Sequence, residues 1–403
     1  MNKNLLRARM KPWCWWFFGG GLLLFLLVSG RLGVELPVGG GYRRVERYPP
    51  LVYLPQVVPP PRINAGAAIL VEAVSGMILY AKNEHVRKAP ASTTKIMTAI
   101  VALEKGNRHD VVTVSPKAAR TGGSSLWLKA GERIVLGELL EGVMLRSAND
   151  GSVALAEHIG GSEQNFAKLM NIKAREIGAI NTNFCNAHGL TAPNHYSSAF
   201  DLALMTRYGF GLPEFVRIVG TREEAVEWYQ GAKTRQVRNT NRLLWSFAGA
   251  DGVKTGTTNR AGYCLVASAT RDGRRFIAVV LNSPDRWGEA ARLLEYGFNN
   301  FSLRLLAKAD TPVAKVAVRQ GYPAQVALYP RRDLMVVLPK GKEGEGQCRV
   351  HLDPAALLLP IKAGATVGRL SFYFQGQEVD WVELYPRERI VRDYWWRRLW
   401  GRQ

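Results

Sequence analysis

The sequence is poor in cysteine, and its few cysteines follow no metal-binding or disulfide pattern. The 403 residues include no C-x-x-C pair, and the cysteines are Cys14, Cys185, Cys264 and Cys348. This spacing excludes a C-x-x-C zinc site and a disulfide framework. Cys14 lies in an apolar N-terminal run, and we interpret the other three as small core residues.

Acidic residues are also scarce relative to basic ones. Asp and Glu number 33 against 54 for Lys and Arg, which gives a formal net charge of +21. Such an excess indicates an anionic neighbour, which can be nucleic acid, a membrane surface or a wall polymer. The sequence contains neither a zinc-finger pattern nor an RNA-binding signature, so we predict no nucleic-acid partner.

A long apolar run opens the chain. A basic head precedes an almost wholly apolar stretch from Trp13 to Ser29. This arrangement is typical of a secretory signal, and the run is about the minimum that spans a bilayer. We predict that residues 1–30 form a signal peptide or an N-terminal membrane anchor, with cleavage left open. Residues 31–62 are rich in Gly and Pro and are predicted to form a linker.

Residues 63–305 have the pattern of an α+β domain. Short apolar runs at its beginning and end flank a middle part with helical periodicity, and Asp272-Gly273 between two such runs is a strong hairpin signal. We therefore expect the first and last segments to share one antiparallel sheet. The expected strands are 67–71, 77–80, 263–269 and 275–281, and the expected helices lie within 130–158 and over 166–177, 200–208 and 286–298.

Two further segments follow this domain. Residues 306–385 contain short β-type runs broken by glycines, which predict a small, β-sandwich-like all-β domain. Residues 386–403 combine arginines with interleaved aromatic residues. We interpret them as a basic amphipathic tail that associates with a membrane surface.

The candidate catalytic centre begins at Ser92 and Lys95. These residues stand three apart at the start of an apolar run, just after Pro90, a helix-start signal. Positions i and i+3 share one face of a helix, and a helix N-terminus favours developing negative charge. A partly desolvated lysine can accept the proton of a serine hydroxyl. The pair therefore predicts an acyl-transfer centre, although Ser-x-x-Lys alone is a weak signal.

Two further motifs follow in a meaningful order. Ser147-Ala148-Asn149 comes after an apolar helical stretch, and Lys254-Thr255-Gly256 precedes the expected strand at Tyr263. S-x-x-K, S-D-N and K-T-G, in this order, are the signature of active-site-serine enzymes that act on penicillin. Three motifs in order are far more specific than any one of them.

With these motifs the chain resembles the D-alanyl-D-alanine carboxypeptidases, which are low-molecular-mass penicillin-binding proteins. The resemblance covers residues 64–385 and continues through Asn186-Ala187-His188-Gly189-Leu190 and Ala261-Gly262-Tyr263. It implies a β-lactamase/transpeptidase-like catalytic domain followed by a small β domain. It also implies removal of the terminal D-alanine from peptidoglycan stem peptides, sensitivity to β-lactams, no metal or other cofactor, and export to the outer face of the cytoplasmic membrane.

The resemblance also assigns roles. Ser92 is the nucleophile, Lys95 the general base, and Ser147 relays a proton to the leaving amine. Asn149 holds Lys95 and the substrate amide. The substrate-binding residues are Lys254, Thr255, Gly256, Thr257 and Ser125, with the backbone N–H groups of Ser92 and Thr257 as the oxyanion hole.

Several further residues lie near the three motifs. We expect His188 to order a loop rather than to catalyse, and Asp150 to be a helix cap or a structural partner. Gly123 and Ser124, together with Ser125, are expected to form a loop over the site. Arg238 and Arg242 are both candidates for binding the substrate carboxylate, and the spacing does not choose between them.

Three alternatives remain open. A class A β-lactamase needs a glutamate-containing loop between the second and third motifs, and Cys185–Leu190 contains no glutamate. A transpeptidase or endopeptidase would use the same scaffold. A non-catalytic wall- or membrane-binding protein is the third, and the presence of every motif side chain argues against it.

Overall fold

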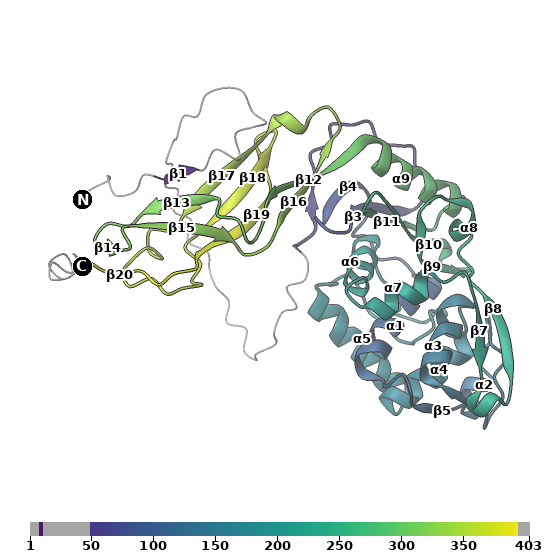
Figure 1. The fold of residues 1–403 in the computed structure, drawn as a ribbon. Helices are drawn as coiled ribbons and strands as arrows, with labels where there is room; N and C mark the ends of the chain where they lie inside the picture. The colour runs from purple at the N-terminus through teal and green to yellow at the C-terminus, as the bar shows by residue number, and fades with distance from the viewer. Residues whose placement is uncertain (1–7, 11–48, 394–403) are drawn as a thin grey trace. The chain divides into compact units, whose positions relative to one another are not determined.

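The structure, a computed structural model, describes residues 8–10 and 49–393. They fall into two compact units that divide between Phe301 and Ser302. The first unit contains residues 49–301, and the second contains residues 302–393 together with 8–10 (Figure 1).

The first unit is built on a six-stranded sheet. β3 and β11 are buried along almost their whole length, because helices cover both faces of the sheet, and their sequences are therefore continuous apolar runs. Neighbouring strands are antiparallel, except that β2 and β4 are parallel. The spatial order is β2 (Val52–Tyr53), β4 (Met77–Lys82), β3 (Ala67–Glu72), β11 (Arg274–Leu281), β10 (Gly262–Arg271) and β9 (Ala250–Thr258).

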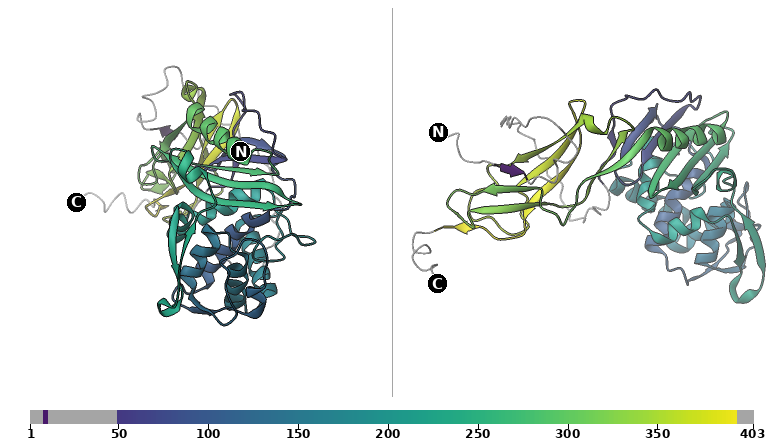
Figure 2. Two further views of the ribbon diagram at one scale, coloured as in Figure 1. Left: turned by 90° about the vertical axis from the view of Figure 1, so that its right-hand side faces the viewer. Right: turned by 45° about the horizontal axis from the view of Figure 1, so that its top comes forward.

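Helices pack on the two faces of this sheet. α9 (Arg286–Asn300) packs on β10 and β11 on one face, whereas α6 (Ala199–Gly209) and α7 (Pro213–Gly220) pack on the other face (Figure 2). The remaining helices of this unit are α1 (Lys95–Lys105), α2 (Pro116–Ala119), α3 (Leu136–Leu145), α4 (Asn149–Gly160), α5 (Glu163–Ile177) and α8 (Leu243–Ser246). Two small sheets pair β5 (Val111–Thr113) with β6 (Arg133–Val135) and β7 (Glu223–Glu227) with β8 (Thr234–Arg238).

The core of this unit surrounds α1. Every residue from Lys95 to Ala102 is buried, so the helix that follows Ser92 is enclosed by apolar neighbours from the sheet and from the other helices. A helix buried on all sides has little freedom to shift. The polar groups at its start are consequently held in a fixed position.

The second unit is all-β, as predicted. Its larger sheet has alternating burial in β15 and β19, which is the pattern of a sheet with one face on a core. The sheet order is β1 (Ala8–Met10), β13 (Ala314–Ala317), β15 (Gln325–Pro330), β19 (Gln377–Pro386), β18 (Gly368–Phe374) and β17 (Gly346–Leu352). Two further pairs join β12 (Phe301–Ala307) to β16 (Leu334–Pro339) and β14 (Gly321–Tyr322) to β20 (Val391–Arg392).

The ends of the chain differ from the sequence predictions in their described parts. The predicted linker 31–62 ends earlier, because Val52–Tyr53 pair with β4 and Leu54 is buried. The described part of the predicted amphipathic tail, residues 386–393, contains no helix, and Ile390 is buried beside Ile361. The predicted signal or anchor, apart from 8–10, and the tail residues 394–403 lie outside the described residues. Within residues 8–10 and 49–393, no helix has both the length and the apolar character to cross a membrane.

The prediction that the cysteines are core residues is right for only one of the described ones. Cys264 is buried on β10, whereas Cys185 is exposed and Cys348 is partly exposed. Cys185 lies in a polar loop where its thiol contacts the carbonyl of Pro193 at 3.3 Å. The hydrophobic character of cysteine alone could not predict that Cys185 is exposed.

Candidate active site

Ser92 and Lys95 lie side by side at the start of α1. Ser92 belongs to a 3₁₀ turn, Ala91–Thr94, that leads directly into α1, so the nucleophile stands just before the α-helix rather than within it. The Nζ atom of Lys95 is 3.1 Å from the Oγ atom of Ser92. The i, i+3 spacing therefore places the two groups in contact, as the sequence predicted.

The environment of Lys95 favours its neutral form. Its side chain is fully buried, and its Nζ lies 2.7 Å from Asn149 Oδ1 and 2.7 Å from the carbonyl oxygen of His188. Burial, followed by the nearby positive charge of Lys254, lowers the pKa of Lys95 well below its ordinary value, against the opposing effect of Asp150. A neutral lysine in this position can accept a proton.

The second motif supplies Asn149 from the start of α4. Ser147 and Ala148 connect α3 to α4, and the backbone of Ser147 has a φ of 64°. This turn buries the Ser147 side chain and directs Asn149 to Lys95. The Nδ2 group of Asn149 donates to the carbonyl of Gly122 at 2.8 Å, which fixes the orientation of its amide.

The third motif lies within β9, an edge strand of the sheet. The sequence placed these residues before the strand at Tyr263, but they form a strand of their own that pairs with β10. Gly256 packs against the nucleophile turn, where a Cβ atom would lie 2.9 Å from the Pro90 carbonyl and 3.0 Å from the Ser92 nitrogen. Only glycine allows this approach, which brings the backbone of Thr257 beside Ser92.

Lys254 and Thr255 occupy the same strand. Lys254 is fully buried, and burial, followed by the charge of Arg286, lowers its pKa to about 7. Its positive charge in turn contributes to the lowered pKa of Lys95. The Oγ1 atom of Thr255 is hydrogen-bonded to Thr240 Oγ1 at 2.6 Å, so the threonine hydroxyl is oriented by a residue that the motif does not include.

Arg286 lies beside the third motif but is not among the site residues predicted from the sequence. Its guanidinium donates to Thr257 Oγ1 at 2.7 Å and to the Gly256 carbonyl at 3.0 Å. Arg238 instead pairs with Glu223 and stacks on Trp245, whereas Arg242 lies over Trp287. Arg286 stands 30 residues beyond Gly256 and follows no motif, so no local signal in the sequence could have found it.

The Ser125 side chain contacts Asp150, the residue that follows Asn149. Its hydroxyl donates to Asp150 at 2.6 Å, and the same carboxylate accepts the N–H groups of Leu126 and Leu128 at 3.0 Å. Asp150 is thus a structural partner that holds this loop. Nearby, Gly123 has a φ of 89°, and a Cβ atom on it would lie 2.6 Å from Asn149 Nδ2.

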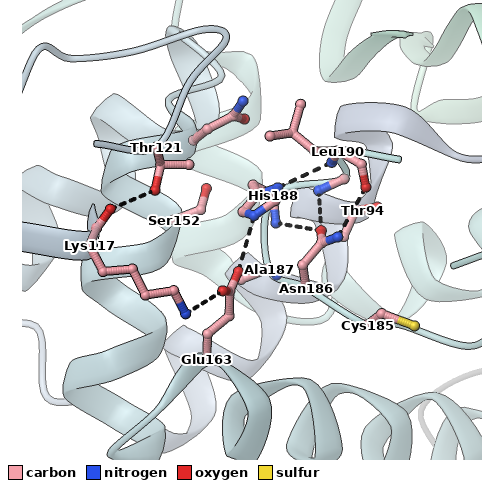
Figure 3. Close-up of polar contacts among 12 residues, drawn as sticks. Thr94, Lys117, Thr121, Ser152, Glu163, Cys185, Asn186, Ala187, His188 and Leu190 are labelled. Carbon is pink, nitrogen blue, oxygen red and sulfur yellow. Dashed lines mark hydrogen bonds and ion pairs between the residues drawn. The ribbon is translucent and has the colours of Figure 1, made fainter. Parts of the chain in front are cut away.

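His188 contributes its backbone to the site. Its carbonyl accepts from Lys95, and Ser92 Oγ is 3.4 Å from the same oxygen. Its ring points away, toward Glu163 and Leu190 (Figure 3). This agrees with the expectation of a loop-ordering residue, and the described residues include no cluster of three or more His, Cys, Asp or Glu side chains that could hold a metal ion.

Two family models match the chain. Residues 55–285 match the model described as D-alanyl-D-alanine carboxypeptidase, and residues 301–392 match the model described as penicillin-binding protein 5, C-terminal domain. The D-alanyl-D-alanine carboxypeptidase DacF of Bacillus subtilis is 38% identical over 322 residues, which cover 78% of this chain and 82% of that protein.

Solved structures show the same similarity. Penicillin-binding protein 5 from Haemophilus influenzae superposes with a TM-score of 0.76 at 34% identity, over 83% of this chain and 100% of that one. The Streptomyces K15 DD-transpeptidase superposes with a TM-score of 0.57 at 33% identity, over 60% of this chain and 100% of that one.

Proposed function

Because the chain belongs to the D-alanyl-D-alanine carboxypeptidase family, we propose that it is a serine enzyme that removes the terminal D-alanine from peptidoglycan pentapeptide stems. The observation that carries this proposal is the arrangement around Lys95 Nζ, which contacts Ser92, Asn149 and the His188 carbonyl. The family relationship supplies the substrate, and this geometry supplies the nucleophile and its base.

The first step is acylation of Ser92. A neutral lysine amine has two N–H groups and one lone pair. The two contacts of 2.7 Å use the N–H groups, so the lone pair faces Ser92 Oγ and receives its proton. The oxygen attacks the carbonyl carbon between the two D-alanines, and the backbone N–H groups of Ser92 and Thr257 stabilise the oxyanion, by about 3–4 kcal/mol per donor.

The leaving group must receive a proton. Ser147 is buried and lies two residues before Asn149, and its hydroxyl relays the proton from Lys95 to the amine of the departing D-alanine. The carboxylate of that D-alanine is bound by Arg286 and by the hydroxyls of Thr255 and Thr257, with Lys254 adding positive charge. Water then attacks the acyl-enzyme, and Lys95 serves again as the base.

A steady-state assay tests this proposal. Wild-type protein should release one D-alanine per pentapeptide, and the Ser92→Ala variant should release none. Appearance of cross-linked dimers in place of free D-alanine would instead identify a transpeptidase, which the similarity to the Streptomyces K15 DD-transpeptidase makes the second candidate.

We further propose that the protein works at the outer face of the cytoplasmic membrane and is inhibited by β-lactams. The +21 net charge supports an anionic surface as its neighbour, and the predicted signal or anchor at 1–30 supports export. The catalytic unit would take residues 49–301, and the β unit would connect it to the membrane-associating tail. Fractionation of cells that express a chain truncated after residue 393 tests the role of the tail, because this truncation keeps the buried Ile390 and strand β20. The proposal requires that the truncated chain leave the membrane fraction.

A further inference from the structure

The segment from Asn186 to Leu190 contacts both partners of the catalytic pair. The His188 carbonyl accepts from Lys95, and Gly189, at a φ of 89°, packs so closely on the Ala91–Ser92 peptide that a Cβ atom there would overlap the Ala91 carbonyl. The segment therefore fixes the lysine amine and the peptide that carries the Ser92 N–H. Its own position must be well determined for the site to work.

A buried carboxylate contacts this segment at His188 and Ala187. Glu163, the first residue of α5, lies 3.1 Å from the Nε2 atom of His188 and accepts the Ala187 N–H at 3.5 Å (Figure 3). Lys117 reaches the other oxygen of Glu163 at 2.8 Å. Burial would raise the pKa of Glu163, but the hydrogen bonds from His188 and Lys117 outweigh it and lower the pKa to about 2.

The hydrogen bonds of His188 also define its tautomer. Its Nδ1 atom accepts the backbone N–H of Leu190 at 3.1 Å, so the ring proton resides on Nε2 and points at Glu163. The Asn186 side chain and Thr98 hold the same segment at other atoms. The imidazole ring is thus held at two atoms, at Nδ1 by the Leu190 N–H and at Nε2 by the Glu163 side chain.

We propose that Glu163 is a positioning residue for the reaction. By holding the His188 ring it places the His188 carbonyl, which with Asn149 occupies both N–H groups of Lys95 and leaves the lone pair for Ser92. This inference rests on the proposed function, because it concerns the same base and nucleophile.

Rapid-mixing measurements of penicillin acylation test it. Glu163→Leu should lower the limiting acylation rate about 10- to 100-fold, the loss expected when reacting groups are misplaced by about 1 Å, and should change the apparent dissociation constant less than about threefold. Glu163→Gln keeps an oxygen that accepts the Nε2 proton and should stay within about threefold of wild type. Lys117→Met, the matched control, leaves the His188 contact in place and should have the same rate as wild type.

A limiting acylation rate for Glu163→Leu equal to that of wild type would overturn the inference. A variant whose apparent dissociation constant rises while its limiting rate is unchanged would overturn it as well. If Glu163→Leu does not fold, Glu163→Asp tests the inference instead. Its carboxylate is one methylene farther from His188, so the limiting acylation rate should be lower than that of wild type. A wild-type protein that is not acylated at all would refute the proposed function instead.

A second, independent observation concerns a cationic pocket of about 360 Å³. Its walls include Arg87, Lys88, Ala89, His195, Arg260 and Ala261, and no carboxylate lines it. Within the described part of the chain, no carboxylate oxygen lies within 4.0 Å of a side-chain nitrogen of Arg87, Lys88 or Arg260. Burial lowers the pKa of His195 to about 4, so the ring is neutral. The positive charge of the pocket is thus uncompensated and suits an anion.

The pocket lies within reach of the scissile bond. Ala89 precedes Ser92 by three residues and Ala261 follows Thr257 by four, so these walls lie within about 11 Å and 14 Å of the two oxyanion donors. A bound peptide spans about 3.3 Å per residue. A carboxylate two or three residues upstream of the scissile bond therefore lies at a distance from that bond comparable to the distance of the pocket.

We infer that this pocket binds a carboxylate in the acyl part of the peptide substrate, an inference that also rests on the proposed function. The probes are two D-alanyl-D-alanine-terminated pentapeptides, one with a free γ-D-glutamyl α-carboxylate and one with that carboxylate as an amide. Wild type should prefer the acid by about fivefold in kcat/KM, the value of one modest charge pair, and Arg260→Gln should abolish the preference.

The matched control is Arg175→Gln, on the exposed face of α5, which should keep the preference. Equal kcat/KM for the two peptides with wild type would overturn the inference, as would a preference that survives both Arg260→Gln and Arg87→Gln. Absence of turnover with either peptide would count against the proposed function and not against the pocket.

Discussion

The Nζ atom of Lys95 lies 3.1 Å from the Oγ atom of Ser92, and the Lys95 side chain is fully buried. Asn149 and the His188 carbonyl bind the two N–H groups of this buried amine, so its lone pair remains available to accept the proton of Ser92. Replacement of Lys95 by Met should therefore lower penicillin acylation by about 10²- to 10⁴-fold, the usual contribution of a general base. Stopped-flow measurement at neutral pH checks this, and a loss below tenfold would contradict it.

The two lysines predict the pH dependence of the reaction. Lys95 acts as a neutral base, so activity should rise as the pH increases through its lowered pKa. Lys254 acts as a cation, so activity should fall as the pH increases through about 7 and Lys254 loses its proton. The kcat/KM profile should thus be bell-shaped. In Lys254→Met the alkaline fall should disappear, and a fall at the same pH in that variant would contradict the assignment.

Arg286 should bind the substrate carboxylate. Its hydrogen bond to Thr257 Oγ1 places the guanidinium beside β9, the strand that carries the third motif, whereas Arg242 lies over Trp287. Loss of a charge-assisted hydrogen bond of about 1.5–3 kcal/mol should raise KM for the pentapeptide about 10- to 100-fold in Arg286→Gln. Arg242→Gln should change KM much less, and the reverse order of the two effects would refute the assignment.

Gly189 should tolerate no side chain. A Cβ atom would overlap the Ala91 carbonyl, and a φ of 89° is itself unfavourable for other residues. Gly189→Ala should therefore lower both the melting temperature and labelling by fluorescent penicillin. Gly122→Ala is the matched control, because a Cβ atom there meets no atom within 4 Å. Equal labelling of the two variants would show that the close packing has no consequence for the site.

The acid stability of the catalytic unit should depend on Glu163. Its pKa of about 2 lies below the ordinary value of 4.5, so the folded state is stabilised above pH 4.5 and loses this stability as the pH falls toward 2. The shift corresponds to on the order of 3 kcal/mol. Urea unfolding at pH 5 and pH 3 should show a smaller difference for Glu163→Gln than for wild type, and an equal difference would exclude this contribution.

The features that the sequence predicted well depend on short-range patterns. Ser92 and Lys95 meet because residues three apart share a helix face, and β10 and β11 pair because Asp272-Gly273 closes a hairpin between two apolar runs. The strand β9 was not predicted, because Gly252, Lys254 and Gly256 give it a weak strand pattern and its pairing with β10 stabilises it.

The contacts that the sequence did not reveal share a different cause. The contact of Arg286 with Thr257, and that of Ser125 with Asp150, join residues that lie 29 and 25 positions apart in the sequence. Likewise, β2 forms because its backbone pairs with that of β4, although the sequence around β2 is rich in proline. Such tertiary contacts leave no periodic pattern, so only the folded chain could assign them.

Mass spectrometry of the penicillin adduct tests the central claim most directly. After incubation with benzylpenicillin and proteolysis, the peptide that contains Ser92 should carry the mass of one intact penicillin, and the Ser92→Ala protein should carry none. An adduct on any other peptide, or an unmodified wild-type protein, would contradict the assignment of Ser92 as the nucleophile.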